Sequence, residues 1–256
     1  MLLPCVIIVF IYSYIPLGGI VMAFQNFIPS LGVFKSPWIG LDNFKYVLSM
    51  PDTMQVLYNT LTIALMKIVA GLIVPITVSL MLNEVRAKTP KRLIQTIIYL
   101  PHFLSWVILS GVLIDILSPS EGIVGMLFRT LGLKPIYFLG DEKWFPYTMV
   151  ISDVWKEFGF GTVIYLAALT GIDPELYEAA LMDGASRWKQ TLHVTLPGIL
   201  PIIVLMTVLA LGNVLNAGFD QIYNMLSAQV YSTGDIIDTM VYRMGLQQVQ
   251  YSVATA

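Results

Sequence analysis

The chain has 256 residues, of which 57% are hydrophobic and only 12% are charged, and its mean hydropathy is +0.77. Soluble domains average about 45–50% apolar and about 25% charged residues, so this composition indicates a protein that lies in a lipid bilayer. The formal net charge of −2 excludes the large positive field that nucleic-acid binding requires.

The first 34 residues carry no charged side chain. A secretory signal peptide has a basic start and an apolar core of about 7–15 residues, so this longer, uncharged stretch predicts a membrane helix instead. Cys5 lies within it and is the only cysteine, which excludes an internal disulfide. The sequence has no Cys/His spacing typical of a metal site.

Five stretches reach the length of about 20 mainly apolar residues that a membrane-spanning helix needs. The fourth is the weakest, because Asp153, Lys156 and Glu157 lie inside it. The sequence therefore predicts an all-α, polytopic membrane helix bundle that forms a single transmembrane domain over residues 1–256. Its five helices are expected at residues 2–25, 57–82, 93–118, 146–170 and 198–220.

The short loop 83–92 carries four basic residues and one acidic residue. Because cytoplasmic loops are enriched in Lys and Arg, we expect this loop in the cytoplasm. Alternation then places the long loops 26–56, 119–145 and 221–248 outside and residues 171–197 back in the cytoplasm.

Residues 171–197 predict a helix–turn–helix elbow on the cytoplasmic side. Asp173 is a good helix N-cap, Pro174 suits the first helical position, and Gly184 permits a sharp helix end. A second short helix can run from about 186 to 193, before Pro197 marks the entry to the last membrane helix. An elbow this short is not stable alone, so we expect it to dock into a groove on another protein.

The same stretch resembles the cytoplasmic motif of ABC importer permeases, which is Glu-Ala-Ala, three residues, Gly, nine residues and then Ile-x-Leu-Pro. Valine replaces the usual isoleucine. The resemblance implies that this elbow couples the permease to its ATPases; the alternative is a surface elbow that packs on its own bundle. The matching residues are Glu178, Ala179, Ala180, Gly184, Val194, Leu196 and Pro197.

The wider sequence is similar to bacterial permeases for complex oligosaccharides, notably over 96–106, 134–145, 155–180 and 212–224. The resemblance implies a bacterial cytoplasmic-membrane location and a sixth helix, most of which this chain lacks. It also implies an oligosaccharide substrate and three kinds of partner: a second homologous permease subunit, two ATP-binding cassette ATPase subunits and an extracellular solute-binding lipoprotein. The chain contains no GxxxxGK[ST] phosphate loop, so a partner must bind the ATP, and we expect no cofactor in this subunit.

Polar groups inside membrane helices are costly, so each one is a candidate for function. Asn213, Asn216 and Asp220 follow i, i+3, i+7 spacing, which predicts one polar helix face with Phe219 beside it. Amides, a carboxylate and a ring suit the hydroxyls and C–H faces of a sugar, and Trp155 could stack on it as well. The alternatives are that the amides bond neighbouring helices and that the tryptophan faces lipid or core.

The charged residues of the fourth helix allow a different mechanism. Asp153 and Lys156 are spaced to form an ion pair, and Lys67 can snorkel or pair with a carboxylate. These groups with Asp220 could serve an ion-coupled secondary transporter, although no internal repeat supports it. A membrane-embedded enzyme would need a catalytic nucleophile or metal set, which the sequence does not show. An ABC permease for another small solute also remains open.

Overall fold

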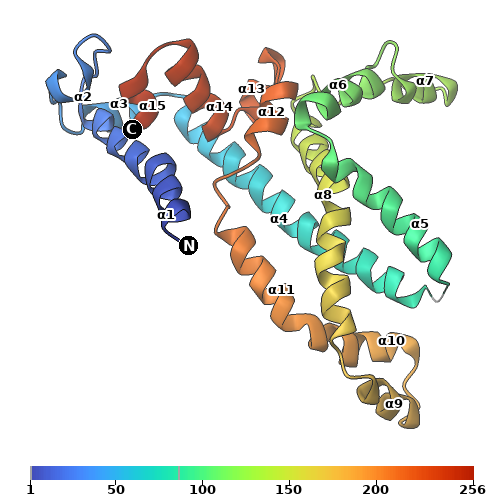
Figure 1. Ribbon diagram of the computed structural model, residues 1–256. Helices are drawn as coiled ribbons and strands as arrows, with labels where there is room; N and C mark the ends of the chain where they lie inside the picture. The colour runs from blue at the N-terminus through green and yellow to red at the C-terminus, as the bar shows by residue number, and fades with distance from the viewer. Residues whose placement is uncertain (1, 86) are drawn as a thin grey trace. The chain divides into compact units, whose positions relative to one another are not determined.

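The computed structural model describes residues 2–85 and 87–256, and the regular secondary structure in these ranges is helical (Figure 1). Gln25 and Trp38 form one isolated antiparallel bridge. The chain divides into two compact units, residues 1–59 with 235–256 and residues 60–234. The predicted all-α class is therefore confirmed for the described residues.

The first unit combines the beginning of the chain with its last helices. Asn43 Nδ2 donates to the carbonyl oxygens of Ala23 and Gln25 at 2.8 and 3.0 Å. The backbone amide of Phe27 donates to Ser252 Oγ at 2.8 Å, which ties the end of η2 to α15. The helices of this unit are α1 (Leu3–Val9), the π-helix η1 (Phe10–Tyr14), the 3₁₀ helix η2 (Ile15–Phe24), α2 (Gly32–Lys35), α3 (Asp42–Ser49), α14 (Ile237–Tyr242), the π-helix η6 (Arg243–Gln247) and α15 (Tyr251–Thr255).

The second unit contains the long helices that surround the candidate site. Helix α4 (Thr53–Glu84) begins in the first unit and continues into the second. The other helices of this unit are α5 (Lys88–Tyr99), η3 (Leu100–Phe103), α6 (Trp106–Leu117), α7 (Ile123–Thr130), α8 (Phe145–Thr170), α9 (Pro174–Met182), α10 (Arg187–Gln190), the π-helix η4 (Thr191–Thr195), α11 (Leu196–Leu211), α12 (Phe219–Met225), η5 (Ala228–Val230) and α13 (Tyr231–Gly234).

Three helical stretches of the described chain are long and apolar enough to cross a membrane: Leu3–Phe24, Thr53–Glu84 and Arg187–Leu211. A fourth candidate is the pair Lys88–Phe103 and Trp106–Leu117, if the two are one broken span. Helix α8 is 26 residues long, which corresponds to about 39 Å at the usual rise per residue. It can therefore span a bilayer by length, although it carries charged residues near its middle.

The helix expected over 93–118 is broken near its middle, where Lys88–Phe103 and Trp106–Leu117 meet at a bend of 104°. Pro101 lies in the 3₁₀ turn η3 and lacks an amide proton for continuing the helix. Ser105 then starts a new helix, since its side chain accepts a hydrogen bond from the amide of Ile108. Apolar composition continues through the break, so hydropathy alone does not reveal it.

The predicted helix over 198–220 ends earlier than expected. Helix α11 stops at Leu211, and a new helix, α12, begins at Phe219. Gly218 has a φ of +96°, which a residue with a side chain rarely adopts. Asn216 and Asp220 therefore do not share one helix face with Asn213.

Close backbone contacts hold α8 against its neighbours. A Cβ at Gly159 would lie 2.0 Å from the carbonyl oxygen of Ile98, so α5 approaches α8 more closely than any side chain permits. A Cβ at Gly161 would lie 3.1 Å from Pro75, inside α4. Small residues allow such approaches between membrane helices. A buried apolar cluster between α8 and α11 consists of Tyr165, Leu169 and Ile199.

Candidate functional site

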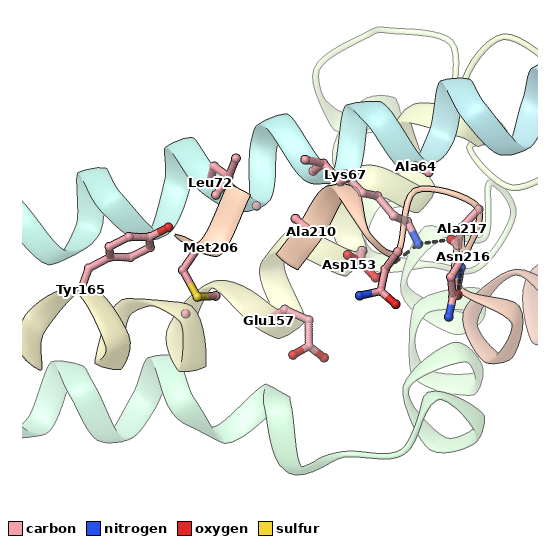
Figure 2. A pocket seen from close by; sticks show the side chains of 15 residues that line it. Ala64, Lys67, Leu72, Asp153, Glu157, Tyr165, Met206, Ala210, Asn216 and Ala217 are labelled. Carbon is pink, nitrogen blue, oxygen red and sulfur yellow. Dashed lines mark hydrogen bonds and ion pairs between the residues drawn. The ribbon is translucent and has the colours of Figure 1, made fainter. Parts of the chain in front are cut away.

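One face of α8 lines a cavity of about 730 Å³. Asp153, Glu157, Gly161 and Tyr165 follow one another at intervals of four residues, so they stack along the same side of the helix. Figure 2 shows this face with α4 running beside it and Met206 and Ala210 of α11 close by. The remaining lining residues are Ala64, Lys67, Ile68, Gly71, Leu72, Asn213, Asn216, Ala217 and Gly218.

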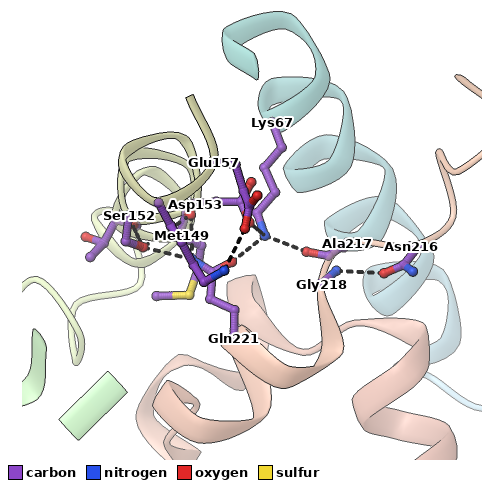
Figure 3. A network of polar contacts seen from close by, with 11 residues as sticks. Lys67, Met149, Ser152, Asp153, Glu157, Asn216, Ala217, Gly218 and Gln221 are labelled. Atoms are coloured by element: carbon purple, nitrogen blue, oxygen red, sulfur yellow. Dashed lines mark hydrogen bonds and ion pairs between the residues drawn. The ribbon is translucent and has the colours of Figure 1, made fainter. Parts of the chain in front are cut away.

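Lys67 is the centre of a polar network at one end of this cavity (Figure 3). Its ammonium nitrogen lies 3.2 Å from Asp153 Oδ1 and 2.7 Å from the carbonyl oxygen of Ala217, and it also donates to Gln221 Oε1. An ammonium group has three protons to donate, and these contacts use all three. The Lys67 side chain is only 10% exposed, so its charge is neutralised locally rather than by water.

Gln221 extends the network from α12 to α8. Its amide nitrogen donates to the carbonyl oxygen of Met149 and to Ser152 Oγ, each at 2.8 Å. A Cβ at Gly218 would lie 2.8 Å from Lys67 Nζ, so only glycine leaves room for the lysine here. The network therefore fixes the irregular segment between α11 and α12 against α4 and α8.

A second polar cluster joins α8 to η3. Glu157 Oε2 lies 2.7 Å from His102 Nδ1, and Glu157 Oε1 accepts from Lys156 Nζ at 2.7 Å. Lys156 also donates to the carbonyl oxygen of His102 at 3.1 Å and lies 5.5 Å from the centre of the Trp106 ring. The expected pairing of Asp153 with Lys156 is therefore wrong, because Asp153 faces Lys67 and Lys156 turns towards η3. The expectation that Lys67 pairs with a carboxylate is confirmed.

Tyr165 lines the cavity, and its hydroxyl oxygen is buried in the cavity wall. Within the described residues, its oxygen is buried and has no hydrogen-bond partner. An unpaired buried hydroxyl costs about 1–3 kcal/mol, so such a group is typical of a place where a ligand or water completes the contact. Apolar surfaces from Leu72, Ile68 and Met206 lie along the same cavity. The combination can bind a solute that carries both hydroxyl groups and C–H faces.

The structure brings together part of the predicted polar face. Asn213 and Asn216 line the cavity, whereas Phe219, Asp220 and Trp155, all described residues, lie outside its lining. Asn213 donates to the carbonyl oxygen of Leu209 at the end of α11, and Asn216 Oδ1 accepts from the amide of Gly218. Both asparagines are exposed, so each keeps other polar atoms available to the cavity.

Sequence reasoning missed Tyr165 and Gln221 as members of the site. The signal for Tyr165 was present, because it continues the four-residue spacing of Asp153 and Glu157 along one helix. The sequence around Gln221 gave a weaker indication that this residue belongs to the site. Its role depends on Lys67, which is 154 residues away in the sequence.

The elbow over 171–197 has the predicted local geometry in its first half. Asp173 caps α9 by accepting from the amide of Glu175 at 3.0 Å, and Gly184 has a φ of +74°. The second half differs, because the helix that starts at Arg187 continues to Leu211 without a break at Pro197. The π-helical turn η4 joins the two segments directly before Pro197, which has no amide proton to donate.

Two contacts hold the elbow at the end of the bundle where α4 finishes. Tyr177 Oη lies 3.0 Å from Thr195 Oγ1, which joins α9 to η4. Arg187 donates to Glu84 at 2.6 Å, so the 83–92 loop and the elbow lie at the same end. Figure 1 shows α9 and α10 projecting beyond this end of α8 and α11.

The residues of the sequence motif are largely at the elbow surface. Glu178, Ala179, Gly184 and Pro197 are exposed, and Ala180, Val194 and Leu196 are half-buried. Large apolar side chains nearby are also exposed, including Met182 at 89% and Trp188 at 73%. An exposed apolar surface of this kind is typical of a protein-binding site.

These features define a class of protein. Apolar spans, a polar cavity between them and an apolar elbow at one end of the bundle are typical of a polytopic membrane transport protein. Comparison with known proteins narrows this class. Residues 67–228 match the family described as "Binding-protein-dependent transport system inner membrane component".

Individual relatives agree with that match. The chain is 41% identical to Protein LplB of Bacillus subtilis and 41% identical to the polygalacturonan/rhamnogalacturonan transport system permease protein YteP of the same organism. Each match covers the whole of this chain and 80% of the relative. A crystal structure of a bacterial alginate ABC transporter, in complex with an alginate pentasaccharide-bound periplasmic protein, contains a chain with 40% identity and a TM-score of 0.91. That match covers 100% of this chain and 85% of the other.

The chain therefore belongs to the family of inner membrane components of binding-protein-dependent transport systems. It is a permease subunit of an ABC importer in a bacterial cytoplasmic membrane, and it is not the ATPase. The predicted family, fold class and location are confirmed, and the secondary-transporter and enzyme hypotheses are set aside. Transport by this family depends on a solute-binding protein.

Proposed function

We propose that this subunit imports an oligosaccharide by alternating access, as one of two homologous permease subunits above two ATP-binding cassette ATPases. An extracellular solute-binding lipoprotein would deliver the sugar. The carbohydrate class is supported by the names of the relatives, which include a polygalacturonan/rhamnogalacturonan permease and an alginate transporter. The lining of the cavity supports the same class, because it pairs amide and carboxylate groups with apolar faces.

The cavity along α8 is the proposed substrate pathway, and the observation that carries this assignment is its mixed lining of carboxylates, amides and apolar side chains. Asn213 and Asn216 contribute amides from the segment that follows α11. Phe219, Asp220 and Trp155 keep at most an indirect role. Because the ammonium protons of Lys67 are already engaged, the lysine holds the cavity wall in place rather than binding the substrate.

The elbow over 171–197 is the proposed coupling element of a single transmembrane domain that spans residues 1–256. Glu178, Ala179, Ala180 and Gly184 would contact the ATPase, while Val194, Leu196 and Pro197 would pass the movement into α11. Two features support this role. The exposed apolar side chains of the elbow need a partner surface, and the helix from Arg187 to Leu211 is continuous, so a push on the elbow reaches the cavity.

The test is sugar-stimulated ATP hydrolysis by the complete complex in proteoliposomes, comparing wild type with Gly184→Trp. Gly184 has a φ of +74° and open space around its Cβ position, so the indole would project from the elbow into the docking surface. We expect the variant to lose stimulation by at least tenfold or to lose its ATPase subunits.

Gly132→Trp is a matched control, because Gly132 has a φ of +72°, equally open surroundings and a position just after α7, away from the elbow. Its backbone strain is the same, so stimulation should persist. Normal coupling in Gly184→Trp with its ATPases still bound would show that the elbow is only a surface feature. If no oligosaccharide stimulates ATP hydrolysis by the wild-type complex, the proposed substrate class is wrong.

A further inference from the structure

A second cavity lies near the ends of α6 and α12, in the part of the second unit opposite the elbow (Figure 1). Its volume is about 420 Å³, within the range of about 300–1,000 Å³ that is usual for small-molecule sites. It shares no lining residue with the larger cavity. The lining residues are Ile114, Ser118, Pro119, Ser120, Tyr137, Leu139, Asn224, Met225, Leu226 and Ser227.

The polar groups of this second cavity are all uncharged. Ser118 and Ser120 place their hydroxyl oxygens 3.2 Å apart at its rim, and Asn224 Nδ2 donates to the carbonyl oxygen of Asp220. Ser227 Oγ is buried and has no hydrogen-bond partner among the described residues. The side chains that line this cavity therefore offer hydroxyl and amide groups and carry no charge to attract an ion.

Tyr137 supplies the aromatic surface of the cavity, and its ring is held in position from behind. A Cβ at Gly140 would lie 2.1 Å from Tyr137 Cε1, so the ring occupies the space that a side chain at this position would fill. The ring still leaves Tyr137 45% exposed. An aromatic face beside hydroxyl and amide groups matches the C–H face and hydroxyl rim of a pyranose.

The turn that carries Ser118 and Ser120 is also fixed by close packing. Cβ atoms at Gly122 and Gly125 would lie 2.4 and 2.6 Å from the carbonyl oxygens of Ile116 and Pro119. Arg129 donates to the carbonyl oxygen of Ser120 and closes the same turn. The serines are therefore held by a backbone that leaves little freedom, which lowers the entropic cost of binding a ligand.

We propose that this cavity is an outer subsite that binds one neutral pyranose unit of the oligosaccharide before the sugar reaches the larger cavity. The proposal rests on the import function given above and adds a second contact point on the opposite side of the membrane from the elbow. Its neutral lining favours an uncharged sugar unit over a uronate.

The test is protection of an introduced cysteine in the complete complex, reconstituted in proteoliposomes. Cys5→Ser removes the only native cysteine, and Ser120→Cys adds one at the cavity rim. The probes are the methyl pyranosides of glucose, galactose, mannose, xylose and rhamnose, with sodium galacturonate as the charged comparison. We expect at least one neutral glycoside to slow labelling by a membrane-impermeant maleimide at least threefold.

Thr130→Cys is the matched control, because Thr130 is exposed at the end of α7 and lies outside the lining. Its labelling should not respond to sugar. In the Ser120→Cys background, Tyr137→Ala and Gly140→Ala should abolish protection, whereas Tyr137→Phe should retain it because the ring remains.

Three results would overturn the subsite: no protection by any of the neutral glycosides, equal protection at Thr130→Cys, or stronger protection by galacturonate. Sugar-stimulated ATP hydrolysis measured on the same vesicles, with the binding protein present, separates the two proposals. Stimulation without protection rejects the outer subsite alone, whereas absence of stimulation rejects the import function.

Discussion

Lys67 shows how a charged residue can persist inside a membrane helix. An unpaired charge in hydrocarbon is expensive, but here a carboxylate, a backbone carbonyl and a side-chain amide accept from the same ammonium group. The acceptors come from α8, from the segment before α12 and from α12 itself. These contacts offset the cost of burying the lysine charge, and they fix three segments around the cavity.

Tyr165 allows the proposed pathway to be tested by removing a single oxygen atom. Tyr165→Phe removes a hydroxyl that has no partner in the described chain, so stability should stay the same or rise by about 1–3 kcal/mol. If the sugar uses that hydroxyl, its loss removes one hydrogen bond and raises the KM for sugar-dependent ATP hydrolysis about 2- to 10-fold.

The measurement combines thermal unfolding of the purified complex with steady-state ATP hydrolysis at several sugar concentrations. Tyr147→Phe is the control, since Tyr147 lies on the same helix, is exposed and does not line the cavity. An unchanged KM in Tyr165→Phe, with both variants equally stable, would remove Tyr165 from the pathway.

Local sequence patterns predicted the structural roles of individual residues better than they predicted which distant residues those residues contact. Asp173 and Gly184 act as a helix cap and a helix end because their roles depend only on neighbouring residues. The four-residue spacing from Asp153 to Tyr165 is a local signal of the same kind, although it was not used in the prediction. The partner of Asp153 was not predictable in this way, because Lys67 is 86 residues away and Lys156 was an equally suitable cation close by.

At the scale of helices, the contact between α5 and α8 depends on the absence of a side chain at Gly159. Gly159→Ala would place a methyl group 2.0 Å from the Ile98 carbonyl oxygen, and neither backbone can move without shifting a helix. Overpacking of this kind costs about 1–3 kcal/mol. We expect a lower unfolding temperature and a reduced yield of assembled complex.

Gly111→Ala provides the comparison within another helix of the same unit. Nothing lies within 4 Å of the Cβ position at Gly111, so a methyl group fits there. Alanine also favours the helix over glycine by up to about 1 kcal/mol, so this variant should be neutral or more stable. Equal unfolding temperatures for the two variants would show that α5 and α8 can separate without cost.

Helix ends explain most of the difference between the expected and observed elements. The 93–118 and 198–220 stretches remain apolar past the points where their helices stop, since bilayer composition constrains side chains more than backbone direction. Pro101 and Gly218 were the local clues to these breaks, but proline and glycine also occur within membrane helices. Pro75 lies inside α4 without ending it.

At the scale of the whole molecule, the orientation of the chain in the membrane follows from the distribution of its basic residues. The 83–92 loop and the elbow lie at one end of the second unit through the Arg187–Glu84 contact, and both carry basic residues. The positive-inside rule places this end in the cytoplasm, where ATPase subunits are found. The loop that contains Lys134 should then face outward.

Cysteine labelling of intact cells that express the full importer tests this orientation. In a Cys5→Ser background, Lys134→Cys should react with a membrane-impermeant maleimide, whereas Lys88→Cys should react only after the membrane is permeabilised. Both lysines lie at positions that the structure describes as exposed, so a difference in reactivity reports the side of the membrane rather than burial. Labelling of Lys88→Cys in intact cells would place the elbow outside, and ATP-driven coupling through it would then be physically excluded.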